Sequence, residues 1–211
     1  MTLAQTAADE LQEQILTGRL AAGTPLRLEE TARALGMSPS PVREALRELE
    51  RLGLVVQVPH RGARVAELTL EDLRDTYAVR ILLETRAVEL ATAAMKPATI
   101  ERAEATLARY HAALEASAMR EAREAHAAFH FTLYEASGSP WLVRLIQPVW
   151  QSSERYRFMA VGTVDELQRR EGEHRGLLAA CAAGDVSRAG ELLAAHLERS
   201  VEEVSARMDH R

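Results

Sequence analysis

The chain has 211 residues, a net charge of −5, and 47% hydrophobic but only 4% aromatic residues. This composition, with its runs of alanine, predicts a mostly helical protein of one or two domains. The single cysteine, Cys181, excludes an internal disulfide, and no segment approaches the roughly 18 apolar residues of a membrane span. The N-terminus lacks the basic region of a signal peptide, so we expect a cytoplasmic protein with no membrane partner.

The N-terminal part begins with two helices separated by a connector. Apolar residues at four-residue spacing predict a helix at about residues 3–17. Residues 18–25 are expected to form the connector, and a second helix is expected at about residues 28–35. Gly36 then ends the second helix and Ser38 caps a third, because Gly is common just after a helix and Ser just before one. This order is typical of a helix-turn-helix.

The third helix, at about residues 39–52, has two opposite faces. Its apolar residues form one arc on a helical wheel, namely Val42, Ala45, Leu46, Leu49 and Leu52. Its hydroxyl and arginine side chains fall on the other side, namely Ser40, Arg43, Arg47 and Arg51. A helix that packs on one face and carries cations on the other fits a DNA major groove. Because Glu44, Glu48 and Glu50 lie nearby, an ordinary solvated charged face is the alternative.

The segment after the third helix favours DNA binding. Residues 54–58 are rich in β-branched side chains, residues 59–62 read as a turn, and residues 63–65 return as a second strand, which together predict a β-wing. Residues 1–66 carry eight arginines and eight acidic residues, so the whole negative charge lies in residues 67–211. We therefore assign residues 1–66 to a winged helix-turn-helix DNA-binding domain.

Residues 67–211 are predicted to form an antiparallel all-α bundle. Thr69 caps a first helix that ends near residue 96. The other helices are expected at about residues 98–117, 119–137, 140–159, 164–183 and 186–208. Helices joined by such short loops are typical of a bundle. The predicted fold class is therefore mostly α, with an N-terminal winged helix-turn-helix and a C-terminal helical bundle.

Four histidines of the bundle are placed to meet at one point. His126 and His130 are four residues apart and share a helix face. His174 and His196 lie about ten and eleven residues on either side of the turn at 184–185, so they reach the same height in a helical hairpin. Converging imidazoles predict a divalent metal site, with zinc or nickel favoured. The alternative is that these are ordinary bundle residues around an organic-ligand pocket.

These segments resemble a known family. The N-terminal part is similar to the winged helix of GntR-type regulators, in LEETARALG at 28–36, SPSPVREAL at 38–46 and PHRGARV at 59–65. The bundle resembles the FCD ligand-binding domain of the FadR branch, in Arg80-x-x-x-Glu84, HAAFH at 126–130, EH at 173–174, GD at 184–185 and AAH at 194–196. The resemblance covers nearly the whole chain.

For residues 67–211 the resemblance implies effector binding and dimerisation. The family's metal is held by one Asp and three His, and a small carboxylate effector completes its coordination. His130, His174 and His196 match the three histidines, whereas His126 stands where the family has Asp, and we expect all four to bind the metal. Arg80 matches the family's arginine and is the expected cation for the effector. An ion pair with Glu84 on the same helix is the alternative role for Arg80.

For the DNA-binding domain the resemblance implies a homodimer that reads a palindromic operator, most often as a repressor. The expected DNA-binding residues are Ser38, Ser40, Arg43, Arg47, Arg61 and Gly62. The serines suit phosphate, the two arginines of the third helix suit base edges, and Arg61 of the wing suits the minor groove or the backbone. Pro39 stands where many relatives carry an arginine, so one DNA contact of the family is missing.

We interpret the chain as a ligand-responsive transcription regulator and not as an enzyme. The alternative from another class is a helical metalloenzyme, but the sequence has no His-Glu-x-x-His motif and no glycine-rich phosphate loop. Within the regulator class, a metal-free bundle that binds an acyl or other organic effector is the second alternative. A constitutive DNA-binding protein with a purely structural bundle is the third.

Overall fold

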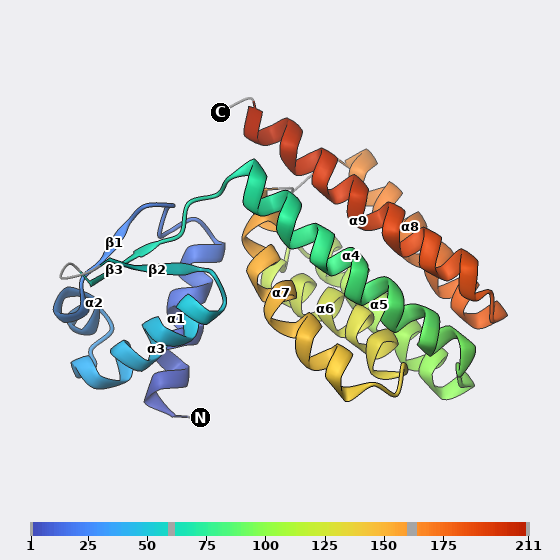
Figure 1. Ribbon diagram of the computed structural model, residues 1–211, viewed down its shortest axis with the longest axis horizontal. Helices are drawn as coiled ribbons and strands as arrows, with labels where there is room; N and C mark the ends of the chain where they lie inside the picture. Colours follow the sequence, from blue (N-terminus) through green and yellow to red (C-terminus); the bar gives the residue numbers. More distant parts are fainter. Residues whose placement is uncertain (1, 59–61, 160–163, 210–211) are drawn as a thin grey trace. The chain divides into compact units, whose positions relative to one another are not determined.

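The structure is a computed structural model that describes residues 2–58, 62–159 and 164–209 (Figure 1). It contains two compact units. Unit 1 comprises residues 1–76, 148–160 and 204–211, and unit 2 comprises residues 77–147 and 161–203.

Three helices and a small sheet make up the N-terminal part of unit 1. The helices are α1 (Leu3–Leu16), α2 (Leu28–Ala34) and α3 (Pro39–Arg51). The strands are β1 (Pro25–Leu26), β2 (Val55–Val58) and β3 (Gly62–Val65), and they form one antiparallel sheet in the order β1-β3-β2. This arrangement is the winged helix-turn-helix that the sequence predicts.

Helix α3 is held in place by its apolar arc. All five residues of that arc are buried, and they pack in one cluster with apolar residues of α1 and of the sheet. Burying each Val or Leu side chain contributes about 1.5–3 kcal/mol, so this cluster fixes how α3 is rotated. The opposite side of α3 is thereby left in solvent.

Strand β1 corrects one expectation from the sequence, which placed residues 18–25 in an irregular connector. Pro25 and Leu26 instead pair with Arg64 and Ala63 of β3. A two-residue strand that begins with Pro leaves no periodic pattern in the sequence, because β3 supplies its pairing and Pro is tolerated at the first position of an edge strand.

Gly62 also differs from its expected place, because it is the first residue of β3 and not the end of the wing turn. Its φ is +86°, and a Cβ at this position would lie 3.1 Å from the Leu26 carbonyl oxygen. The close approach of β1 therefore requires glycine.

In the part of the chain that the structure describes, six helices follow, and their bounds differ from the sequence predictions only at the helix ends. They are α4 (Leu70–Ala93), α5 (Pro97–Glu115), α6 (Met119–Glu135), α7 (Pro140–Met159), α8 (Val164–Ala183) and α9 (Val186–Asp209). The Thr69 hydroxyl accepts a hydrogen bond from the Asp72 backbone N at 3.1 Å, which confirms the predicted cap of α4.

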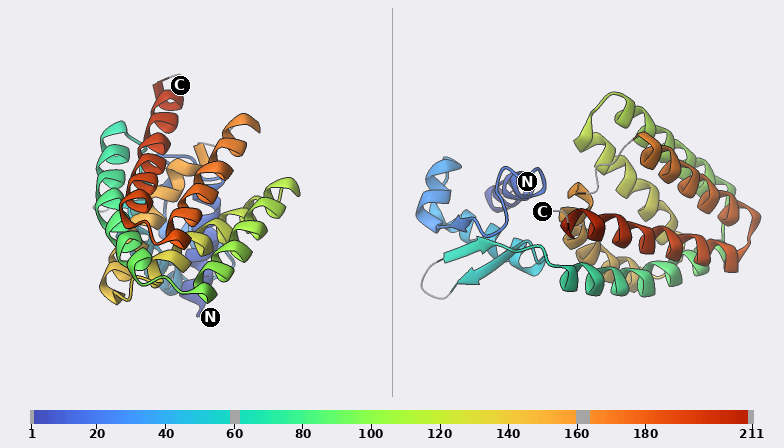
Figure 2. Two further views of the ribbon diagram at one scale, coloured as in Figure 1. Left: turned by 90° about the vertical axis from the view of Figure 1, so that its right-hand side faces the viewer. Right: turned by 90° about the horizontal axis from the view of Figure 1, so that it is seen from above.

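Within unit 2, residues of all six helices form the bundle (Figure 2). Helix α5 packs against α6 and α8, and the turn at Gly184 joins α8 to α9 as a hairpin. Among the described residues, no helix is both long enough and apolar enough to cross a membrane.

Candidate DNA-binding surface and candidate metal centre

The exposed face of α3 is the candidate DNA-binding surface. Ser38, Ser40, Arg43 and Arg47 are all exposed there. Ser38 has the backbone conformation of an N-cap, but its hydroxyl makes no capping hydrogen bond, which corrects the capping role expected of that side chain. Pro39 and Pro41 have no backbone N–H, so the Ser38 hydroxyl and the Ser40 backbone N–H are the groups at the start of α3 that can bind an anion such as a phosphate.

The three arginines of this face are not equivalent. Arg51 forms an ion pair with Glu48 one turn before it. Within the described part of the chain, Arg43 and Arg47 form no ion pair. The two arginines that we expect at base edges are therefore the two whose guanidinium groups stay available, which argues against the alternative of a self-compensated surface.

The wing provides less evidence for DNA binding than α3 does. Arg61, the expected wing contact, lies outside the described residues. Gly62 is described, and its close approach to Leu26 explains the glycine without any contact to DNA.

The structure brings the four predicted histidines together in unit 2. His126 and His130 come from α6, His174 from α8 and His196 from α9, and all four are buried. The Nε2 atom of His174 lies 3.1 Å from Nε2 of His126 and 3.2 Å from Nε2 of His130. One ring nitrogen from each residue can be chosen so that all four lie within 4.8 Å of one another.

These separations fit a transition-metal ion. With a zinc–nitrogen bond of about 2.05 Å, two tetrahedral ligand atoms lie about 3.3 Å apart. The two shortest separations at His174 are close to that value. The set as a whole lies within 4.8 Å, which exceeds twice the bond length, so a ring at that separation has to move by several tenths of an ångström for all four to bind one ion. Four imidazoles provide no hard oxygen ligand, so the donor set fits zinc or nickel better than magnesium or calcium.

Two of the histidines form hydrogen bonds with side chains outside the cluster. His196 Nδ1 donates to the Glu173 carboxylate at 2.7 Å, and Arg199 Nε contacts the other Glu173 oxygen at 2.7 Å. Burial would raise the pKa of Glu173, but the hydrogen bond with His196 and the arginine charges outweigh it and lower that pKa. His130 Nδ1 lies 3.1 Å from the hydroxyl of Tyr134. Such partners fix the orientation of a ligand imidazole.

Arg80 adopts the alternative role that the sequence left open. Its Nε donates to Glu84 Oε1 at 2.6 Å and its Nη2 to Glu84 Oε2 at 3.1 Å, and both side chains are buried. Burial would lower the pKa of the Arg80 guanidinium, but the Glu84 charge outweighs this effect and raises it. Any effector carboxylate at Arg80 therefore has to share the guanidinium with Glu84.

Tyr134 and Glu84 were not among the site residues chosen from the sequence. The sequence does contain a signal for Tyr134, because Tyr134 follows His130 by four residues and lies on the same face of α6. A tyrosine at that spacing is also an ordinary core residue, so the sequence alone does not distinguish the two roles.

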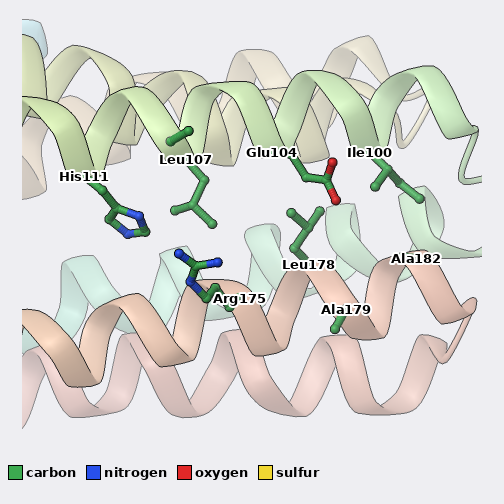
Figure 3. A pocket seen from close by; sticks show the side chains of 9 residues that line it. Ile100, Glu104, Leu107, His111, Arg175, Leu178, Ala179 and Ala182 are labelled. Carbon is green, nitrogen blue, oxygen red and sulfur yellow. The ribbon is translucent and has the colours of Figure 1, made fainter.

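A groove between α5 and α8 is a second feature of the bundle (Figure 3). It has a volume of about 380 Å³ and a mostly apolar floor that includes Leu107 and Leu178. His111 from α5 and Arg175 from α8 point toward each other across it, and both contact Glu171. Because Glu171 already pairs with Arg175 and contacts His111, the groove presents no strong signal for a charged ligand.

A winged helix with an open arginine face, followed by a helical bundle, is the organisation of a DNA-binding transcription regulator. Comparison with protein-family models gives the family. Residues 3–65 match the gntR family of bacterial regulatory proteins, and residues 75–199 match the FCD domain. The chain belongs to the GntR family and carries an FCD domain, as its FadR-branch features predict.

Similar proteins agree with this assignment. The chain is 30% identical to the uncharacterized HTH-type transcriptional regulator BphR of Paraburkholderia xenovorans, over 95% of this chain and 84% of BphR. It is 29% identical to the HTH-type transcriptional repressor GlaR of Escherichia coli, over 89% of each chain. The solved structure of E. coli McbR/YncC superposes with a TM-score of 0.83 and 25% identity, over 99% of each chain. These relatives are transcription regulators, so the metalloenzyme alternative is not retained.

Proposed function

We propose that the protein is a cytoplasmic, homodimeric, ligand-responsive repressor whose bundle senses a small carboxylate through a bound metal. In this proposal, residues 1–66 read a palindromic operator, and residues 67–211 bind the effector and dimerise. The convergence of His126, His130, His174 and His196 is the observation that carries the sensing part. The open face of α3 supports the DNA-binding part.

For DNA, Arg43 and Arg47 are assigned to base edges, and the hydroxyls of Ser38 and Ser40 to phosphate. Arg61 and Gly62 are assigned to the wing contact. A bidentate arginine–guanine contact is worth about 1–3 kcal/mol, so Arg43→Ala should weaken operator binding roughly 5- to 150-fold. Arg51→Ala is the matched control, because Arg51 lies on the same face but is paired with Glu48.

Mobility-shift titrations at one fixed salt concentration measure this difference. We expect Arg51→Ala to stay close to the wild type while Arg43→Ala loses affinity for the operator and not for unrelated DNA. Equal operator affinities for Arg43→Ala and the wild type would contradict the assignment of Arg43.

For the metal, the four imidazoles are the ligands, and the ion when bound supplies a positive centre to which a carboxylate coordinates. The residues of the chain hold the ion, orient the imidazoles through Glu173 and Tyr134, and keep the cluster out of water. Arg80 is assigned to the effector carboxylate, in competition with its pair to Glu84.

Metal content and melting temperature test this part. The wild type should contain zinc or nickel and lose stability in chelator, since a metal at a hundredfold excess over its Kd stabilises a fold by about 2.7 kcal/mol. His174→Ala should lose both the metal and the chelator effect. His111→Ala is the control, because His111 lies outside the cluster. A wild type that takes up no metal and melts identically in chelator would leave the metal-free regulator in its place.

Signal transmission requires that the effector favour one arrangement of the dimer, because a ligand with equal affinity for two states shifts neither. Residues 66–69 are our candidate for the transmitting segment. Within unit 1 the end of this segment is tied to α7, where the Tyr156 hydroxyl lies 3.3 Å from the Thr69 backbone N and donates to Asp72 at 2.6 Å. A change in α7 would therefore act directly on the start of α4.

A further inference from the structure

A chain of hydrogen bonds leads from Arg80 to the histidine cluster. Arg80 donates to Glu84, the Tyr134 hydroxyl lies 2.6 Å from Glu84 Oε2, and the same hydroxyl lies 3.1 Å from His130 Nδ1. We propose that Tyr134 is the positioning residue that fixes the tautomer of His130, so that its Nε2 lone pair faces the cluster. This inference rests on the proposed metal-binding role of the histidines.

The direction of each hydrogen bond follows from the chemistry of the groups. Arg80 reaches both oxygens of Glu84, so Glu84 is held as a carboxylate, which only accepts hydrogen bonds. Tyr134 must therefore donate its proton to Glu84. The phenolic oxygen is then left as an acceptor, and His130 Nδ1 must be the donor to it.

The proton on Nδ1 determines which nitrogen of His130 can bind a metal. A neutral imidazole carries one proton, so a proton on Nδ1 leaves Nε2 of His130 as a lone pair. That Nε2 atom lies 3.2 Å from Nε2 of His174, on the side where the four rings converge. His130 is thus set as a ligand before any ion arrives.

Burial strengthens this chain of hydrogen bonds from Arg80 through Glu84 and Tyr134 to His130, which we call the relay. Arg80, Glu84, His130 and Tyr134 are all buried from bulk solvent. Hydrogen bonds in such an environment are stronger, and an unpaired group there is costly. The removal of one hydroxyl should therefore change the tautomer of His130.

The relay differs from the support of His196, which donates directly to a carboxylate. Tyr134 places a neutral phenol between His130 and the charge of Glu84, and Arg80 balances that charge. The relay thus orients a ligand without adding net charge to the cluster.

The test uses the full-length, metal-free protein with 15N-labelled histidine. Long-range 1H–15N correlation spectra distinguish the Nδ1–H from the Nε2–H tautomer. We expect His130 of the wild type in the Nδ1–H form, and Tyr134→Phe with a mixture of both forms. Zinc affinity of Tyr134→Phe, measured against a competing chelator, should fall by about 10- to 100-fold, as for other partners of ligand imidazoles.

Two further variants are compared with Tyr134→Phe. Tyr110→Phe is the matched control, because Tyr110 is buried and its ring contacts those of His126 and His174, yet within the described chain its hydroxyl bonds to neither. It should keep wild-type zinc affinity. In Glu84→Gln the amide can donate to the Tyr134 oxygen, which then donates to His130, so the Nε2–H tautomer should increase.

A wild-type His130 in the Nε2–H form, or zinc affinity in Tyr134→Phe equal to that of Tyr110→Phe, would overturn the proposal. A failure of the metal-binding role can be distinguished from a failure of the relay. If the wild type binds no zinc, the metal role fails while the tautomer spectra still decide the relay. If the wild type binds zinc and Tyr134→Phe is unaffected, only the relay is wrong.

Discussion

The buried ion pair between Arg80 and Glu84 provides a quantitative test of the bundle. Side-chain exposure is 2% for Arg80 and 0% for Glu84, and Nε lies 2.6 Å from the carboxylate. Arg80→Met keeps most of the apolar stem but leaves the Glu84 carboxylate buried without its cation. Breaking a buried pair in this way destabilises a protein by about 3–5 kcal/mol. For a chain of this size that corresponds to a melting temperature lower by roughly 6–20 °C.

The same helix offers a matched control. Arg86 and Glu89 form an ion pair at 3.2 Å, but the Arg86 side chain is 59% exposed. Exposed pairs contribute about 0–1 kcal/mol, so Arg86→Met should change stability little. The double variant Arg80→Met/Glu84→Leu removes both charges together with the hydrogen bond from Tyr134 to Glu84, so it should lose only about 1–3 kcal/mol.

Urea denaturation of the metal-free variants, followed by circular dichroism, measures these differences. If Arg80→Met were no less stable than Arg86→Met, the Glu84 charge would not depend on Arg80, and our account of the pair would be wrong. If the double variant were less stable than Arg80→Met, the uncompensated charge would not be the cause of the loss.

Three further predictions concern the wing, the assembly and the metal. Gly62→Ala should lower the free energy of unfolding of the winged helix by more than about 1 kcal/mol, because Ala is strained at φ +86° and its Cβ would meet Leu26; an unchanged thermal transition would contradict this. Light scattering at micromolar concentration should give twice the chain mass of 23.3 kDa, and a mass of 23.3 kDa would count against the dimer. Metal affinity should fall as the pH is lowered, because protons compete with the ion for the imidazole nitrogens; a Kd that does not change with pH would argue against histidine ligands.

The elements with strong periodic patterns could be predicted from the sequence. The apolar arc of α3 and the stretch between Thr69 and Pro97 both give clear helical signals, and the structure has helices at both places. The meeting of His174 with His196 could also be predicted, because equal distances from a hairpin turn translate into equal heights.

Features that depend on tertiary contacts could not be predicted. Strand β1 exists because β3 pairs with it, and Ser38 caps α3 by backbone conformation without using its hydroxyl. For Arg80 the sequence left two roles open, since an arginine four residues before a glutamate is equally consistent with an ion pair and with a ligand-binding cation. Only the burial of both side chains decides how tightly that pair is held.

The all-imidazole ligand set gives the proposed sensor a particular charge balance. In the proposed site His126 takes the position that the resemblance gives to Asp, so the four proposed ligands would be neutral and a bound divalent ion would keep both of its positive charges. The charge of Glu84 is balanced by Arg80, and that of Glu173 by nearby arginines, so neither carboxylate cancels the charge of the ion. Buried charge without a counter-ion is unfavourable, and an incoming carboxylate relieves it. In this site the effector would therefore supply the anionic ligand that the protein itself provides in relatives with Asp.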